Sequence, residues 1–564
     1  MSEAGARFSR RSMLATPLAL AGCASSSDYF GKAKTPRFQR LVFQLGAEPD
    51  TLDPAMSQAG SEEFILPSLF EGLLTLHPTT NKPVAAIATH YDSDAHQTRF
   101  TFYLRGHAQP AGIRLEGGPA RSMPARWSDG RIITAHDFVY SWRRAVDRST
   151  AAPWAYMFYC IRNAEEINSG RHPVESLAVE AIDNFTLRVT MRSSTPWFLQ
   201  LHDSFVFYAV PRHVVERMGS LWTLPEHMVC CGPFQLAEWK SRNALRLVKN
   251  PHYYDAAAVQ LEEITMLPVV NTVASVNLYK AGESDWVPGK LVPPIVMPSL
   301  QRKKDFHTAP AFWCMFYAIN TRVAPFNNVL VRYALNMATD KRVIATFMEA
   351  GRMPAASLMP PCSGYTAIDT LPVEIEGAVY DVLKYDPAGA RELLRKAGVD
   401  SVRIEILYPN RPGTADLPQI LQQQWRKTLG AEVIPIAREE KIWLQARSAL
   451  EYKGVAERGF IGDYLDPNTF LNAFQSGPSV IGSGWSDPQY DVMLAEANEE
   501  ANTTRRMRKL ADCERRLLLA MPILPLYYNV LAYLRKPYVQ GFDPRQLGLV
   551  RFKYVWVDTH WSSQ

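Results

Sequence analysis

The 564-residue sequence lacks the short motifs that mark common enzyme classes. It contains no GxSxG nucleophile elbow, no HExxH zinc motif, no GxxxxGK[ST] phosphate loop and no GxGxxG dinucleotide fingerprint. Its 12 histidines are scattered, and the His-Asp neighbours in HDFVY and LHDSF do not face each other on a helix or strand. We therefore expect no enzymatic activity, no bound metal and no cofactor.

Charge of one sign and long apolar runs are also scarce. The net charge is only +5, and the most basic run, QRKKD at Gln301–Asp305, is short and lacks interleaved aromatic residues, so we expect no nucleic-acid groove. No segment after the first 23 residues has 18 uninterrupted apolar residues, so none is expected to span a membrane. With 47% hydrophobic and 21% charged residues the composition is globular, and the length predicts two or three packed units.

Metal-type cysteine spacing is missing too. Beyond Cys23 there are six cysteines without CxxC or Cys/His zinc spacing: Cys160, Cys230, Cys231, Cys314, Cys362 and Cys513. The adjacent pair Cys230 and Cys231 could bridge only with strain, and a disulfide between distant cysteines cannot be assigned from sequence. We expect mostly buried thiols.

The N-terminus, in contrast, carries an export pattern. Arg7, Arg10 and Arg11 precede the short apolar run SMLATPLALAGC, which is typical of a signal peptide. SRRSML resembles a twin-arginine signal, and LAGC resembles a bacterial lipobox ending in Cys23. The sequence thus predicts a signal peptide over 1–23, lipidation of Cys23 and a flexible tether over 24–37; a tail with a chance cysteine is the alternative.

Predicted strands alternate along the chain with helices whose first and last residues carry clear capping signals. Alternating apolar residues predict strands at 40–45, 98–105, 184–192 and 432–436. Thr134 with Asp137 forms a capping-box signature, Asp386 and Gly398 bound a second helix, and Gly430 ends a third. The Pro/Gly-rich stretch 106–126 reads as a surface loop. These signals favour α/β layers.

Several stretches together resemble solute-binding proteins of peptide ABC importers, the oligopeptide- and dipeptide-binding class called solute-binding family 5. They run in order from residue 40 to the C-terminus: AEPDTLDPA, LFEGLLTL, RWSDGRIITAHDFVYSWRRAVD, GPFQLAEW, LVKNPHYYD, YKAGESDW, FYAINTRVAPFNNVLVRYALNMATDKR, GWSDPQYD and MPILPLYYN. Each stretch alone is weak evidence for the family, and the resemblance rests on their order and on the length of chain that they cover together.

The resemblance implies an α/β, two-lobed periplasmic-binding-protein fold of the large peptide-binding class, with an extra subdomain on the first lobe. The implied first lobe is discontinuous, built from 38–75, 198–312 and 521–564. The extra subdomain is expected at 76–197 and the second lobe at 313–520.

The segment RGFIGDYLDPNTF places Asp463 among apolar and glycine residues that read as a half-buried strand. A carboxylate there needs a cation, which could come from an arginine such as Arg458, a metal or a ligand. GFIGDY resembles the family's GW-x-ADY strand, whose Asp holds the α-ammonium group of the ligand. The resemblance therefore implies that Asp463 binds the ligand; an internal ion pair is the alternative.

Other ligand contacts follow from the same resemblance. The backbone of Gly459, Phe460 and Ile461 is expected to pair with the peptide, as in β-strand addition. Further implied positions, each with a structural alternative such as a turn or helix core, are Glu48, Trp154, Tyr156, Trp485 and Asp487.

The sequence also departs from the family. Relatives have an arginine shortly before the Gly-Trp pair, where this chain has Glu457 and Arg458, so recognition of a ligand carboxylate there is open. Some relatives bridge a cysteine at the position of Ile461 to one near the boundary of the second lobe; Cys314 would lack that partner.

The function implied is capture of oligopeptides between closing lobes and delivery to ABC permease subunits served by separate ATPase subunits. A monomer in the periplasm or cell envelope, lipid-anchored to a membrane, is expected. Three alternatives stay open: the same fold binding a metal chelate, haem, opine or sugar, a sensor or chaperone receptor, or a secreted hydrolase.

Overall fold

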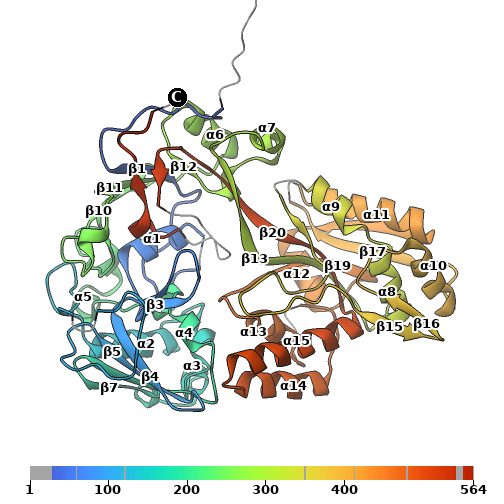
Figure 1. Ribbon diagram of the computed structural model, residues 1–564, viewed down its shortest axis with the longest axis horizontal. Coiled ribbons are helices and arrows are strands. Elements are labelled where there is room, and N and C mark those ends of the chain that lie inside the picture. The colour runs from blue at the N-terminus through green and yellow to red at the C-terminus, as the bar shows by residue number, and fades with distance from the viewer. Residues whose placement is uncertain are drawn as a thin grey trace, which may run out of the picture.

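The computed structural model describes residues 28–58, 60–119, 122–348, 351–411, 413–477, 481–541 and 550–562. Over these residues the chain forms two lobes joined by a pair of long strands (Figure 1). None of the described helices combines the length and apolar character that a bilayer crossing requires. The predicted signal peptide, Cys23 and the start of the predicted tether lie outside the described residues.

One mixed sheet runs through both lobes, in the order β18, β17, β19, β13, β20, β12, β1, β11, β10, β9, with β14 beside β20. Its strands are β1 (Arg40–Gln44), β9 (Phe234–Lys240), β10 (Ala244–Lys249), β11 (Glu263–Leu267), β12 (Trp286–Val287), β13 (Phe306–Ile319), β14 (Met353–Pro354), β17 (Arg403–Pro409), β18 (Glu432–Arg438), β19 (Gly454–Ile461) and β20 (Ile523–Arg535). Parallel pairs join β1 to β11 and β12, and β17 to β18 and β19. The remaining pairs are antiparallel.

The chain passes from the first lobe to the second along β13 and returns along β20 (Figure 1). These strands pair antiparallel from Phe306↔Leu534 to Ala318↔Ile523. The register shifts between Pro310 and Cys314, where the proline has no N–H to donate to the ladder. The ladder is therefore interrupted between its first-lobe and second-lobe parts.

The second lobe packs helices on both faces of its part of the sheet. Successive side chains of β13 alternate: Met315, Tyr317 and Ile319 belong to one core, and Cys314, Phe316 and Ala318 to the other. The helices are α8 (Val329–Met337), α9 (Lys341–Phe347), α10 (Pro387–Lys396), α11 (Asp416–Leu429), α12 (Glu440–Ser448), α13 (Asn468–Leu471), α14 (Pro488–Glu499) and α15 (Thr503–Ala520). A hairpin, β15 (Pro372–Ile375) and β16 (Ala378–Asp381), lies at its far edge (Figure 1).

The first lobe carries a second sheet of five antiparallel strands in the order β6, β4, β5, β8, β7. These strands are β4 (Ala88–Ser93), β5 (Arg99–Leu104), β6 (Ile113–Arg114), β7 (Val179–Asp183) and β8 (Thr186–Thr190). Two hairpins are β2 (Leu74–Leu76) with β3 (Pro83–Ala85) and β21 (Val539–Gln540) with β22 (Trp556–Val557). The helices are α1 (Glu62–Leu69), α2 (Ala135–Val146), α3 (Ala164–Asn168), α4 (Phe198–Leu201), α5 (Arg212–Met218), α6 (Thr272–Ala281) and α7 (Met297–Leu300).

The α/β, two-lobed architecture is thus as predicted, and several local signals are confirmed. Thr134 and Asp137 form the capping box of α2, and Asp386 accepts hydrogen bonds from two backbone amides at the start of α10. Gly430 ends α11 in the left-handed conformation. The second sheet lies inside the predicted subdomain 76–197, whose boundaries stay predictions.

One local prediction is wrong in part. The stretch expected to be a loop over 106–126 contains the short strand β6, in which Arg114 and Ile113 pair with His90 and Tyr91 of β4. A two-residue strand is too short for the alternation of side chains to be visible in sequence. The six described cysteines after Cys23 are free, and Cys230, Cys231, Cys314 and Cys513 are buried.

Candidate ligand-binding site

Strand β19 has an open edge where it faces away from β13. From Val455 to Ile461 its residues pair with β13, ending at Trp313↔Ile461. On the other side β17 pairs only with Gly454, Val455 and Ala456. Among the described residues no strand occupies that side of Glu457–Ile461. The backbone there is available to another extended chain.

Asp463 lies in the loop beyond β19, not within the strand as the sequence suggested. Gly462 donates its backbone N–H to the carbonyl of Phe312, and a Cβ at this glycine would come within 2.4 Å of the Phe312 ring. The chain turns there, and the N–H of Asp463 donates to Oγ1 of Thr469 at 3.1 Å. Ile461, expected to be half-buried, is 59% exposed because it ends the strand at the open edge.

The carboxylate of Asp463 has no cationic partner among the described residues. Its Oδ2 accepts a hydrogen bond from the hydroxyl of Tyr156 at 3.2 Å. Burial raises the pKa of Asp463, and the Tyr156 hydrogen bond opposes that rise only in part. The alternative of an internal ion pair is not seen: Arg458 forms none with it, and its guanidinium carbon lies 6.0 Å from the Phe460 ring centroid. Asp463 is a partly desolvated anion held by one neutral donor.

Tyr156 reaches Asp463 from the other lobe. It belongs to a short 3-10 helix, Ala155–Phe158, and is 45% exposed. Burial and the negative charge of Asp463 both raise the pKa of Tyr156, so the hydroxyl stays a donor. Trp154 precedes the helix with its ring centroid 5.9 Å from that of Tyr156, and its buried Nε1 has no partner among the described residues. The structure thus brings three predicted residues together across the gap between the lobes.

Glu48 is engaged within the first lobe. Its carboxylate accepts from Nε1 of Trp239 at 2.9 Å, from Oγ of Ser241 at 3.2 Å and from the backbone N–H of Arg242. The Trp239 hydrogen bond is the main reason why the pKa of Glu48 is lowered. These bonds connect Glu48 to the turn between β9 and β10, as expected if Glu48 has the structural role that was the alternative to ligand binding. A role in ligand binding stays a prediction.

Trp485 and Asp487 also make structural contacts. Asp487 caps α14 by accepting from the N–H groups of Gln489 and Tyr490. It also forms a bidentate pair with Arg516 at 2.7 and 3.0 Å, the main cause of its lowered pKa. The ring of Trp485 meets that of Tyr490 edge-on, with centroids 5.1 Å apart. Among the described residues, no hydrogen bond or ion pair joins either side chain to Asp463.

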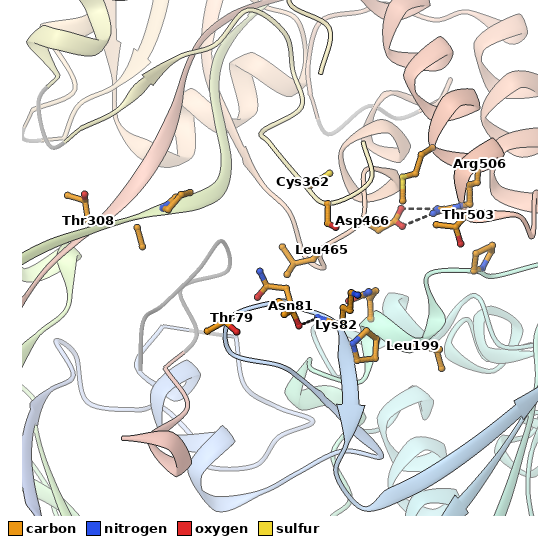
Figure 2. A pocket seen from close by; sticks show the side chains of 18 residues that line it. Thr79, Asn81, Lys82, Leu199, Thr308, Cys362, Leu465, Asp466, Thr503 and Arg506 are labelled. Carbon is orange, nitrogen blue, oxygen red and sulfur yellow. Dashed lines mark hydrogen bonds and ion pairs between the residues drawn. The ribbon is translucent and has the colours of Figure 1, made fainter. Parts of the chain in front are cut away.

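Sequence reasoning missed a cavity of about 730 Å³ between the lobes (Figure 2). Its walls come from the β2–β3 turn, the start of α4, β13 at Thr308–Pro310, the loop after β19 and α15. Asp466 and Arg506 border it as a buried bidentate pair with N–O distances of 2.6 and 2.8 Å. The guanidinium carbon of Arg506 also lies 5.0 Å from the ring centroid of Trp197. Segments this far apart in sequence give no local signal of the cavity.

Comparison with known proteins identifies the family of this two-lobed chain. The family model of bacterial extracellular solute-binding proteins, family 5, matches residues 124–480, which is more than half of the chain. The chain belongs to this family. Among its curated relatives, the probable deoxycholate-binding periplasmic protein YgiS of Escherichia coli is 33% identical over 90% of this chain and 92% of the relative. The periplasmic oligopeptide-binding protein OppA of Salmonella typhimurium is 32% identical over 96% of this chain and 97% of its own.

Similar solved structures support the two-lobed fold. The unliganded open form of the murein tripeptide-binding protein MppA matches with a TM-score of 0.78 and 28% identity over 93% of this chain and 98% of its own. Another structure, of Escherichia coli MppA, gives 0.71 at the same identity over 93% and 99%. Haemophilus influenzae OppA in complex with the peptide RPPGFSPFR gives 0.70 at 26% identity over 93% and 100%. Of these two MppA structures, the unliganded open form gives the higher TM-score.

Proposed function

We propose that this chain captures oligopeptides between its two lobes and delivers them to the permease of an ABC importer. The observation that carries the proposal is Asp463, a partly desolvated carboxylate without a cationic partner among the described residues, facing the other lobe beside an open strand edge. The α-ammonium of a peptide would supply the missing charge through a charge-assisted hydrogen bond.

The peptide backbone would lie along the open edge of β19. Gly459, Phe460 and Ile461 would pair with it, which satisfies the donors and acceptors that both chains bury. Such contacts do not depend on side-chain identity. At Gly459 a Cβ would meet Nε1 of Trp313 at 2.6 Å, so any larger residue there would force the Trp313 ring to shift.

The room between the lobes would accommodate varied side chains. The cavity of about 730 Å³ is lined by both polar and apolar residues, among them Asn81, Gln200, Leu465 and Met507. Water molecules in such a space can bridge different ligand groups to the walls. Closure about β13 and β20 would then bury the ligand.

Delivery requires a membrane partner. We propose permease subunits driven by separate ATPase subunits, with this chain acting as a monomer that hydrolyses nothing. Export by the N-terminal signal and lipidation of Cys23 would hold it in the periplasm or cell envelope. OppA and MppA carry the word periplasmic in their names, which supports that location.

A second candidate is a non-peptide solute in the same cleft. The relative YgiS is described as a probable deoxycholate-binding protein, and a bile acid has no α-ammonium group. A ligand of that kind would leave Asp463 to its hydrogen bond with Tyr156.

Two measurements separate these candidates. Mass spectrometry of ligands released from gently purified protein is expected to yield intact peptides, whereas a sterol or another non-peptide solute would favour the second candidate. Calorimetry is expected to show that tri-alanine binds and that its N-acetylated form binds much more weakly. If both forms bind the wild type equally well, Asp463 does not hold the ammonium group.

A further inference from the structure

Residues 28–32 form a strap that is fastened to the first lobe beside α6 and α7. The backbone N–H groups of Phe30 and Gly31 donate to the two carboxylate oxygens of Asp305, at 2.8 and 3.0 Å. Because Asp305 is fully buried, water cannot replace these donors if the strap leaves. At Gly31 a Cβ would lie 2.7 Å from the carbonyl oxygen of Tyr279, so only glycine lets the strap approach α6 this closely.

Two further contacts fix the position of the strap. The carbonyl of Lys32 accepts from Nζ of Lys536 at 2.7 Å, and its N–H donates to the carbonyl of Lys280 at the end of α6. The ring of Phe30 packs against the core that α6 and α7 share, with Nζ of Lys280 4.4 Å from its centroid. The place where the chain reaches the first lobe from its N-terminus is therefore defined.

The surface around the strap is basic. Residues 28–34, 280–283 and 301–304 carry six basic and two acidic side chains. One of the two acids, Asp28, pairs with Lys304 at 2.7 Å, so it does not offset the other basic groups. The exposed basic side chains that form no ion pair within the described part of the chain are Lys32, Lys34, Lys280 and Arg302.

Exposed apolar side chains accompany these charges. Val273 stands one turn before Asn277 and two turns before Lys280 on the outer side of α6, and it is 61% exposed. Ile295, just before α7, is 86% exposed. Both helices lie at the end of the first lobe away from the second sheet (Figure 1). We call this surface the strap face; its members are Lys32, Lys34, Val273, Lys280, Ile295 and Arg302.

We propose that the strap face docks onto a bilayer surface rich in anionic lipid headgroups. Exposed aliphatic side chains beside lysine and arginine suit the boundary between headgroups and acyl chains. Each basic group adds attraction to an anionic surface, and this attraction falls off within about 10 Å at physiological salt. None of the members lines the cavity between the lobes, so docking does not occupy it.

The inference rests on the proposed lipidation of Cys23 and adds which side of the protein faces the membrane. Five residue steps separate Cys23 from Asp28, a reach of at most about 18 Å. A lipid on Cys23 would therefore hold the strap, and the strap face around it, close to the headgroups.

Vesicle binding of the mature chain tests this proposal. The chain from residue 23 onward, with Cys23→Ser so that it carries no lipid, is sedimented with vesicles of phosphatidylcholine alone or mixed with an equal amount of phosphatidylglycerol. At low ionic strength it is expected to bind the anionic vesicles at least roughly tenfold more tightly, and added salt should weaken this binding. Because the tested chain has no lipid, the result is independent of the lipidation of Cys23.

Matched variants locate the contact. The triple variant Lys32→Gln, Lys280→Gln and Arg302→Gln is expected to bind the anionic vesicles roughly tenfold to a hundredfold more weakly. The control, Arg395→Gln, Lys427→Gln and Lys441→Gln, removes the same charge from exposed positions of the second lobe and should bind as the wild type does.

The apolar part of the strap face has its own pair of variants. Ile295→Ser is expected to weaken binding to the anionic vesicles roughly threefold or more, because less apolar surface enters the boundary region. Val379→Ser changes a 69% exposed side chain of the second lobe and should have no effect. Calorimetry with tri-alanine, expected to give wild-type affinity, reports that every variant is folded.

Two results would overturn the inference. Equal binding of the wild type to both kinds of vesicle would show that anionic headgroups are not recognised, and equal losses in the two triple variants would show that net charge alone is responsible. Neither result affects peptide binding, which the vesicle assay does not measure. A wild type that binds the anionic vesicles as expected but binds no peptide would overturn the proposed function and leave the strap face standing.

Discussion

Replacing Asp463 by asparagine is expected to weaken peptide binding by about 2–5 kcal/mol, the usual result of removing one partner of a buried charge pair. The structure supports a loss of this size and argues against a smaller one. Burial has already raised the pKa of Asp463 before any ligand arrives, and the hydrogen bond from Tyr156 does not neutralise the charge. Asparagine keeps the shape and accepts that hydrogen bond, so the loss measures the charge alone.

The pH dependence provides a second signature. An ammonium ligand binds the ionised carboxylate, and burial raises the pKa of Asp463 above 3.8 in the free protein. Affinity is therefore expected to fall as the pH drops through that raised pKa. The asparagine variant has no proton to take up and should lose this part of the dependence.

Calorimetry of tri-alanine with wild type, Asp463→Asn and the exposed control Asp400→Asn decides the matter. The control should bind as the wild type does. The reasoning is refuted if Asp463→Asn binds tri-alanine with unchanged affinity, or if N-acetyl tri-alanine loses as much affinity from this substitution as the free peptide does.

Three further predictions concern the surroundings of the site. Tyr156→Phe removes a hydrogen bond that lowers the pKa of Asp463, so the pH midpoint of peptide binding should move upward. Calorimetry at a series of pH values measures this midpoint, and an unchanged or lower midpoint would contradict the prediction. Arg506→Met leaves the buried Asp466 unpaired and should lower the free energy of unfolding, measured in urea, by about 3–5 kcal/mol. Adding Asp466→Leu should recover most of this loss. If Arg506→Met causes no loss, the pair is not buried. Burial raises the pKa of Glu457 from 4.5 to about 7, so the folded state loses stability as the pH rises from 4.5 to about 7 and carries the full penalty above that; Glu457→Gln should gain up to about 3 kcal/mol at pH 8, a figure that already includes the attraction of Arg411, and nothing below pH 4.5. Urea denaturation at pH 8 and pH 4 checks the last, and an equal gain at both values would contradict it.

Local features of the fold could be predicted because their causes are local. A capping residue such as Asp386 bonds to amides two and three residues ahead, and Gly430 ends its helix by its own backbone conformation. Such signals act within about one helical turn, so they can be recognised in the sequence.

The site itself depended on contacts between distant residues. Tyr156 and Asp463 meet although 307 positions separate them, and the partners of Glu48 stand 191 to 194 positions away. The residues around Asp463 indicated that its carboxylate needs a cation, but only the family resemblance pointed to a ligand as that cation and to Tyr156. The open edge of β19 depends on where β17 stops pairing, which the sequence of β19 does not encode.

Strand β20 has a consequence for how the protein is made. It is the last long strand of the described chain, yet it lies between β12 and β13 in the middle of the sheet. Until residues 523–535 have been synthesised, β12 and β13 each present a bare edge, and neither half can complete its ladder. Both halves can therefore complete their parts of the sheet only after β20 has been synthesised, and a chain cut short before β20 would expose two unpaired strand edges instead of yielding one finished lobe.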